Sequence, residues 1–285
     1  MSSHLMETPL ITASELIQSS IEILQKQGQT DKTALDSLRL AQKVLQGLDP
    51  YLDASSTEGP KGLKALIEET DKHDYDTAYK NKQLSFPVSA KWSAGAYEGN
   101  FIAMIAKAIK AKRVLEVGMF TGTTTLAVAD VLPKEGGKII ALELDAYLRE
   151  LANPFFERAG VKERVDVRIG KAMDSIQEMI KAKEDPFDLI FIDADKGAYQ
   201  QYYDVIMDNG LLRKGGVLLV DNVLYKASPF VPELQQATPE QLKTAIQFEN
   251  GKALAAFNKF VRQDDRVDVT ILPVRDGVSW IQYKG

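Results

Sequence analysis

The sequence predicts an α/β protein with a mostly parallel sheet and helices on both of its faces. Between about residues 113 and 221, five apolar runs alternate with segments of helical periodicity, and such continuous runs are typical of parallel strands buried on both sides. Two further runs are separated by Arg275-Asp276, and Asp276-Gly277 is a hairpin turn signal. We therefore expect seven strands, the last two forming an antiparallel hairpin.

Each predicted strand is a short apolar run, and each predicted helix has apolar residues at helical spacing. The expected strands are Val114–Gly118, Lys138–Leu144, Val165–Gly170, Phe187–Asp193, Gly216–Asp221, Val267–Val274 and Gly277–Tyr283. The expected helices of this region are 94–112, Thr123–Leu132, Ala146–Ala159, Ala172–Lys183, Ala198–Met207 and Gly251–Arg262.

The first third of the chain has a different character. Residues 11–47 carry Ile, Leu and Val at helical spacing, and Gly47-Leu48-Asp49-Pro50 is expected to stop this helical segment. A loop at 55–62 and a short helix at Gly62–Thr70 follow. We expect an N-terminal helical extension over residues 1–88 and an α/β domain that carries the chemistry over residues 89–285.

Composition excludes several classes of function. The 285 residues include no cysteine and two histidines, which excludes disulfides and thiolate metal sites and disfavours a Ser-His-Asp triad. The net charge is −5 without a long basic block, so we expect no nucleic-acid partner. No apolar run approaches the roughly 20 residues that span a bilayer, and the first residues lack the pattern of a signal peptide. A cytoplasmic protein without a membrane partner is expected.

The segment 113–124 is the first candidate for ligand binding. An apolar run contains Glu116 near its end and is followed by Gly118 and Gly122, and a turn without Cβ atoms lets a nucleoside approach the backbone. Glu143 ends the next apolar run, where a carboxylate can accept both hydroxyls of a ribose. These features predict a nucleoside cofactor, although the G-x-G-x-x-G of dinucleotide-binding proteins is missing. Glycines that serve only chain packing are the alternative.

Two neighbouring strand candidates end in carboxylates. Asp193 follows one apolar run, and Asp221 follows the next with Asn222 beside it. Adjacent strands lie about 4.8 Å apart, so both aspartates can reach one ion. Three oxygen donors without His or Cys suit a hard divalent cation, with Mg²⁺ first and Mn²⁺ or Ca²⁺ as alternatives. The opposing interpretation is that these acids only cap strand ends and helix starts.

Taken together, these motifs resemble those of the cation-dependent class I O-methyltransferases, which include caffeoyl-CoA and catechol O-methyltransferases. The resemblance covers about residues 89–281, and the segments that carry it are Ala94–Phe101, Leu115–Gly122, Phe191–Lys196, Val220–Asn222 and Leu272–Gly277. It implies a Rossmann-like fold, S-adenosylmethionine (SAM) as methyl donor, a divalent cation and a homodimer. Leu48–Asp53 and the segment after Asn222 resemble the O-methyltransferases of mycosporine (gadusol-type) pathways.

The resemblance also implies roles for individual residues. Those expected to bind SAM are Glu116, Gly118, Thr124, Glu143, Ala172, Asp193 and Asp195. Within this set, Glu143 would bind the ribose hydroxyls and Ala172 would lie at the adenine. The metal ligands would be Asp193, Asp221 and Asn222. Lys196 corresponds to the lysine that is the general base of catechol O-methyltransferase, and we count Asp193 with it as catalytic.

The expected function is transfer of the SAM methyl group to a hydroxyl of a vicinal oxygen pair, in a catechol, a caffeoyl-type phenol or a gadusol-type enol. A cation chelated by both oxygens lowers the pKa of the attacked hydroxyl, and Lys196 takes the proton if burial and the metal depress its own pKa. Two alternatives stay open. Glu143 lies about 20 residues beyond the glycine turn, which also fits an NAD(P)-dependent Rossmann oxidoreductase. The other is a SAM-binding module without catalysis.

Overall fold

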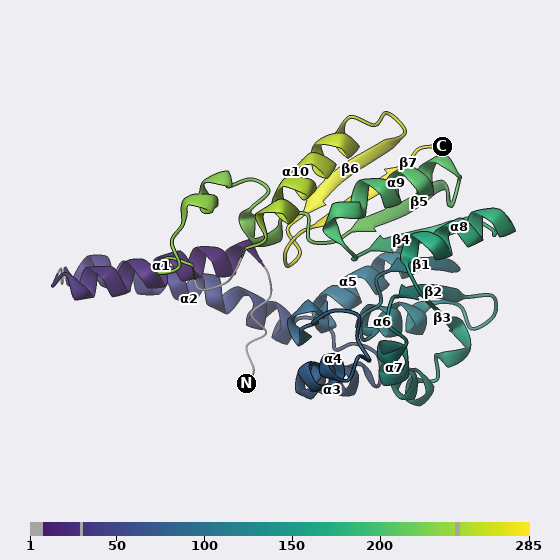
Figure 1. Cartoon of the computed structure of the whole chain (residues 1–285), viewed down its shortest axis with the longest axis horizontal. Coiled ribbons are helices and arrows are strands. Elements are labelled where there is room, and N and C mark those ends of the chain that lie inside the picture. Colours follow the sequence, from purple (N-terminus) through teal and green to yellow (C-terminus); the bar gives the residue numbers. More distant parts are fainter. Residues whose placement is uncertain (1–7, 29–30, 243–245) are drawn as a thin grey trace.

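A computed structural model describes residues 8–28, 31–242 and 246–285, and its centre is a seven-stranded sheet with helices on both faces (Figure 1). The strand order is β3-β2-β1-β4-β5-β7-β6, and β7 is antiparallel to both of its neighbours. The strands are β1 (Arg113–Val117), β2 (Lys138–Glu143), β3 (Val165–Ile169), β4 (Phe187–Ile192), β5 (Leu212–Val220), β6 (Val267–Leu272) and β7 (Val278–Tyr283). The predicted Rossmann-like sheet and its C-terminal antiparallel hairpin are confirmed.

Consecutive strand residues face opposite sides of the sheet and so build two cores. Val114 of β1 belongs to one core, whereas Leu115 and Val117 belong to the other. The first core is covered by α5 (Gly95–Ala108), α6 (Thr123–Val131) and α7 (Ala146–Ala159). The second core is covered by α8 (Ala172–Ala182), α9 (Tyr199–Asp208) and α10 (Phe248–Arg262). Short 3-10 helices lie at Ala90–Trp92, Lys162–Arg164, Lys196–Ala198, Tyr225–Ala227 and Pro232–Gln236.

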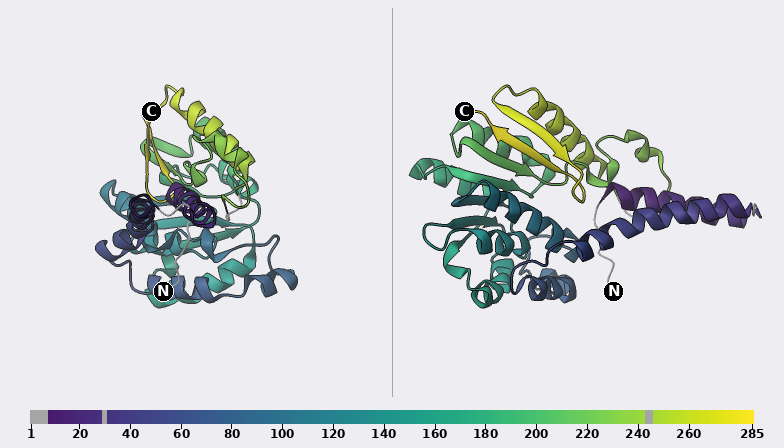
Figure 2. Two further views of the ribbon diagram at one scale, coloured as in Figure 1. Left: turned by 90° about the vertical axis from the view of Figure 1, so that its left-hand side faces the viewer. Right: turned by 180° about the vertical axis from the view of Figure 1, so that it is seen from behind.

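The first two helices form a hairpin that stands out from this body. Helices α1 (Pro9–Lys26) and α2 (Lys32–Ser55) lie side by side in every view (Figures 1 and 2). In contrast, α3 (Leu63–Lys72) and α4 (Tyr75–Lys80) lie against the body, and Leu63 and Leu66 are fully buried in the first core. The division of the chain at residue 88 stays a prediction, to which we return below.

Two details of the first helices differ from expectation. The periodicity over 11–47 covers two helices, because α1 ends at Lys26 and α2 begins at Lys32. The predicted stop at Gly47–Pro50 is wrong, since α2 continues through Pro50 to Ser55. A proline inside a helix removes one backbone hydrogen bond, and contacts made elsewhere in the fold can offset that loss. The residues flanking Pro50 make such contacts, as Asp49 and Asp53 both pair with Arg275.

Polar contacts attach the hairpin to loops at one edge of the sheet. The hydroxyl of Thr12 donates to the carbonyl of Lys226 at 3.1 Å. Arg275, in the turn between β6 and β7, pairs with Asp49 at 2.9 Å and with Asp53, and its guanidinium lies 4.8 Å from the ring centre of Tyr97. The side chain of Arg275 is only 3% exposed, so these contacts replace its hydration. The segment 226–250 therefore lies near the hairpin, although its residues 243–245 are outside the described part.

Candidate active site

The backbone ladder places two acids at the carboxyl edge of the sheet. The N–H of Asp193 donates to the carbonyl of Val117 in β1 at 2.9 Å, and the N–H of Asp221 donates to Ile192 in β4 at 3.0 Å. Each aspartate is thus the first residue beyond its strand, and the neighbouring strand fixes its backbone. In open α/β sheets ligands bind beyond this edge, so both acids lie where a ligand is expected.

The two glycines of the first turn accommodate the protein's own chain. A Cβ on Gly118 would lie 2.1 Å from the carbonyl oxygen of Asp193, and one on Gly122 would lie 2.6 Å from the ring of Phe156. Both residues also have left-handed backbone, with φ of 97° and 81°. Close packing of Gly118 against Asp193 brings the ends of β1 and β4 together. Both glycines are therefore needed for packing of the protein's own chain, as the alternative interpretation of this turn expected.

The turn between β6 and β7 packs onto the loop that follows β5. Backbone N–H groups of Val223 and Leu224 donate to the carbonyls of Gly277 and Asp276, at 3.0 and 2.7 Å. Asn222, which has left-handed backbone with φ of 60°, donates its side-chain amide to the carboxylate of Asp276. This bond occupies the amide nitrogen and leaves the amide oxygen of Asn222 for another partner.

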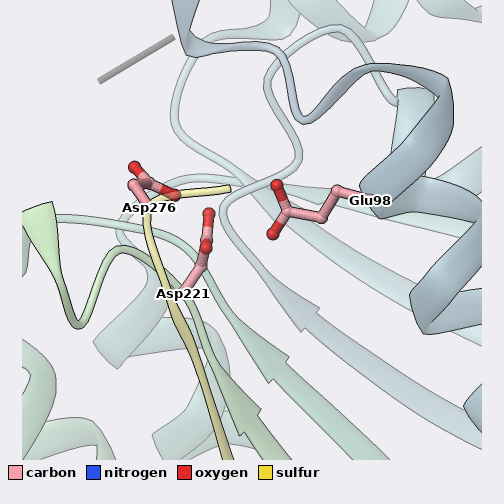
Figure 3. A group of neighbouring side chains, drawn as sticks. All are labelled: Glu98, Asp221 and Asp276. Atoms are coloured by element: carbon pink, nitrogen blue, oxygen red, sulfur yellow. The ribbon is translucent and has the colours of Figure 1, made fainter. Parts of the chain in front are cut away.

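Three carboxylates meet at this point (Figure 3). Glu98 comes from the first turn of α5, Asp221 from the end of β5 and Asp276 from the β6–β7 turn, and one oxygen of each lies within 4.8 Å of the others. Glu98 Oε1, Asp221 Oδ1 and Asn222 Oδ1 are among the buried side-chain atoms that have no hydrogen-bond partner in the described part of the chain, as are Tyr199 Oη and Arg275 Nε. We call the first three atoms the open oxygens. Buried polar atoms normally have partners, so the open oxygens point to a ligand that the protein lacks on its own.

Burial governs the electrostatics of the cluster. It raises the pKa of both Glu98 and Asp221 well above the usual carboxyl range, and the negative charges of their neighbours raise it further. Burial also raises the pKa of Asp276, to about 7, although Lys196 and the Asn222 hydrogen bond oppose the rise. Repulsion between these carboxylates and the cost of burying their charges both make the ionised cluster unfavourable. A bound cation would offset both effects.

Lys196 lies next to the cluster in an ion pair with Asp193. Its Nζ is 3.2 Å from Asp193 Oδ1, and both side chains are about one-fifth exposed. Burial disfavours the ammonium, but its electrostatic interactions with Tyr199, Asp193, Asp221 and Asp276 outweigh burial and raise the pKa of Lys196 well above its usual value. In the protein alone Lys196 is therefore protonated, the opposite of the lowered pKa that a general base needs.

The acids at the ends of β1 and β2 are paired with the protein. Glu116, buried at 1% exposure, accepts the hydroxyl of Thr125 in α6, and burial raises its pKa to about 8. Glu143 accepts backbone N–H groups from Phe120 at 2.8 Å and from Asp145 at 3.0 Å. Burial raises the pKa of Glu143, and these bonds oppose the rise. The remaining lone pairs of Glu143 are available to ribose hydroxyls.

The other residues expected at the cofactor lie along the same edge. Thr124 is buried in the first turn of α6, and Ala172 begins α8 after β3. Asp195 follows β4 and accepts the hydroxyl of Tyr202 at 2.7 Å. Since β3, β2, β1, β4 and β5 are consecutive in the sheet, all the residues predicted for SAM and metal lie in one row. Their roles as ligands stay predictions.

Glu98 and Asp276 are the site residues that sequence reasoning missed. In the sequence, Asp276 was interpreted only as part of a hairpin turn. It approaches Asn222 because β7 pairs with β5, and the distance between the two residues along the chain does not predict that pairing. Glu98 lies in the segment Ala94–Phe101 that carries the family resemblance. The only sequence signal for its role is that it is an acid in the first turn of a mostly apolar helix. Both residues reach Asp221 only through the tertiary fold.

Comparison with known proteins identifies the family. A profile of the O-methyltransferase family matches residues 53–284. Caffeoyl-CoA O-methyltransferase 1 of Zea mays is 33% identical over 222 residues, which cover 77% of each chain. Caffeoyl-CoA O-methyltransferase of Medicago sativa is 33% identical over 221 residues, covering 77% of this chain and 80% of that protein. The crystal structure of the SAH-bound methyltransferase PaMTH1 of Podospora anserina superposes with a TM-score of 0.68 and 27% identity, covering 85% of this chain and 96% of that chain.

Fold, site and comparisons agree on a class of enzyme that transfers methyl groups from SAM to oxygen. The chain belongs to the O-methyltransferase family. It is a SAM-dependent O-methyltransferase of the caffeoyl-CoA type, which decides against the nicotinamide-dependent alternative and against a module without catalysis. None of the described helices combines the length and apolar character needed to cross a membrane.

Proposed function

We propose that this enzyme is cation-dependent and methylates one hydroxyl of a vicinal oxygen pair on a small phenol or enol. The observation that carries the proposal is the pair of open oxygens on Asp221 and Asn222, buried beside the Lys196–Asp193 ion pair. Carboxylate and amide oxygens are the donors that Mg²⁺, Mn²⁺ and Ca²⁺ prefer. The residues present therefore fit the cation that the family resemblance implies.

The chain's own residues divide the work of the reaction. Asp193, Asp221 and Asn222 would hold the cation, which supplies Lewis acidity that lowers the pKa of a neighbouring substrate hydroxyl. SAM supplies a sulfonium methyl group, whose S–C bond breaks as the new O–C bond forms while the electron pair stays on sulfur. Glu143 would hold the ribose and so fix the direction from which the methyl group is presented.

Lys196 would receive the proton of the attacked hydroxyl on Nζ. In the protein alone the surrounding carboxylates keep this amine protonated. A divalent cation held by those carboxylates would weaken their attraction for the ammonium while burial remains, and the pKa of Lys196 would then be lower, as a base requires. The base role thus depends on the cation role.

Chelation also defines the substrate class and the test. Two neighbouring oxygens are needed, so catechols, caffeoyl-type phenols and gadusol-type enols fit, and isolated phenols do not. Turnover of a catechol should disappear in EDTA and return with Mg²⁺, and the meta-dihydroxy isomer should not react. Full activity in excess EDTA, or equal turnover of the two isomers, would contradict the proposal.

We further propose that the chain is a cytoplasmic homodimer, with residues 1–88 as a helical extension of the methyltransferase domain at 89–285. Exposed apolar side chains recur along one side of α2, at Leu40, Val44, Leu48 and Tyr51. A second copy of the chain packed on this side of α2 would cover these apolar side chains. Sedimentation equilibrium should give a dimer, and Val44→Glu should give a monomer.

A further inference from the structure

Glu98 is a buried acid that the proposed metal trio of Asp193, Asp221 and Asn222 leaves without a role. Its residue is 2% exposed, and Oε1 is one of the open oxygens. Helix α5 begins at Gly95, so Glu98 lies in its first turn and its side chain points toward Asp221 (Figure 3). A carboxyl group is rarely buried unless it is paired, and the pairing of Glu98 therefore needs an explanation.

Protein groups account for only part of that pairing. One oxygen of Glu98 lies within 4.8 Å of one oxygen of Asp221, and these two buried carboxyl groups repel each other when both are charged. The nearby positive groups are committed elsewhere, because Lys196 pairs with Asp193 and Arg275 pairs with Asp49 and Asp53. Four carboxyl groups, those of Glu98, Asp193, Asp221 and Asp276, thus share one close ammonium.

Each of the open oxygens comes from a different residue, and these residues come from two separate parts of the fold. Asp221 and Asn222 extend from the end of β5, and Glu98 approaches from α5. Asp276 holds the amide nitrogen of Asn222, so the amide oxygen stays available. Three hard oxygen donors without a partner form a more complete cation site than the β5 residues alone.

We propose that Glu98 is a ligand of the divalent cation, which it would hold together with Asp221 and Asn222. This inference rests on the cation dependence proposed above and adds a ligand that the β-strand ends do not supply. Binding would bring a charge of +2 among these acids, and all three open oxygens would gain a partner. Helix α5 would then be anchored to β5 through the ion.

Binding of Mn²⁺ to the SAM-free enzyme, followed by electron paramagnetic resonance, tests the inference directly. Wild type should bind Mn²⁺, and Glu98→Gln, which keeps the shape and removes the charge, should bind it at least about tenfold more weakly. Glu98→Asp should recover part of the affinity. Glu178→Gln, on an exposed part of α8, is the matched control and should bind as wild type does.

Thermal unfolding separates a ligand from a merely structural residue. In EDTA, Glu98→Gln should be as stable as wild type or more stable, since a buried acid has been neutralised. With Mn²⁺, wild type should gain melting temperature and the variant should gain much less. Wild-type affinity in Glu98→Gln would overturn the inference and leave cation dependence intact, as would a variant destabilised in EDTA. A wild-type enzyme that binds no Mn²⁺ would overturn both.

Discussion

At the ends of β1 and β2 the acids are bound by the protein, whereas at the end of β5 and in α5 they keep open oxygens. Glu143 accepts two backbone N–H groups and Glu116 accepts Thr125. Asp221 and Glu98 each leave one buried oxygen without a hydrogen-bond partner. We call the ends of β1 and β2 the cofactor half, and the ends of β4 and β5 with Glu98 and Asp276 the cation half.

This difference separates two ways of building a binding site. The cofactor half is organised before its ligand arrives, so a ligand adds hydrogen bonds to acids that are already held in place. The cation half carries unbalanced charge, and it completes its bonding only with an added positive ion. Substitutions in the cation half should therefore reduce methyl transfer and leave SAM binding intact, whereas substitutions in the cofactor half should reduce SAM binding.

The largest effect is expected at Asp221. Asp221→Asn removes a charge from the cation half without changing volume, and methyl transfer should fall by more than about 100-fold because the cation is lost. SAM affinity should stay within about threefold of wild type, since the cofactor half is untouched. Initial rates with a catechol and calorimetric titration with SAM give the two numbers. A parallel loss of SAM binding would mean that the two halves are not separable.

Lys196→Ala should lower kcat by about 10²–10⁴-fold, the usual contribution of a general base. The cation would still acidify the hydroxyl, so the reaction should slow rather than stop, and raising the pH should recover part of the loss. SAM affinity should be nearly unchanged. Rates between pH 6 and pH 10 measure both effects, and a wild-type kcat at pH 7 would remove the base role.

Glu143→Gln tests the cofactor half. Charge-assisted hydrogen bonds contribute about 1.5–3 kcal/mol each, so losing the charge opposite the ribose should weaken SAM by roughly tenfold or more. The demethylated product, S-adenosylhomocysteine, carries the same ribose and should weaken by a similar factor, while Mn²⁺ binding should not change. Calorimetry with both nucleosides checks this, and unequal losses would place Glu143 away from the ribose.

The last prediction concerns stability rather than binding or rate, and it is a pH dependence that arises from Glu116. Its folded pKa of about 8 lies above the ordinary 4.5, so the folded protein keeps a proton that the unfolded chain releases. The free energy of unfolding should therefore fall as the pH rises from about 5 to about 8, with a slope of at most about 1.4 kcal/mol per pH unit from this group. Urea unfolding in EDTA should show a flatter profile for Glu116→Gln. An identical profile would contradict the protonated state of Glu116.

The sequence was sufficient for the sheet and insufficient for the full site, for one physical reason. Strands such as Phe187–Ile192 are local apolar runs, so the sequence alone predicts them. It also predicts Asp193 and Asp221 at the ends of two strands, although the structure ends each strand one residue earlier. Glu98 and Asp276 become site residues only because α5 and the β6–β7 turn pack beside β5. The continuation of α2 past Pro50 likewise goes with a contact that is distant in sequence, the ion pair of Asp49 with Arg275.

The contact between Asp53 and Arg275 also has a consequence for the order of events during synthesis. The two residues are 222 positions apart, and they join one of the first helices to the last turn of the chain. Since domains made on the ribosome fold from the N-terminus onward, α1 and α2 can pair early, but they cannot dock through Arg275 until the final hairpin has emerged. Asp276, the neighbour of Arg275, arrives at the same moment. The nascent chain therefore completes its acidic cluster only after the β6–β7 turn has left the ribosome.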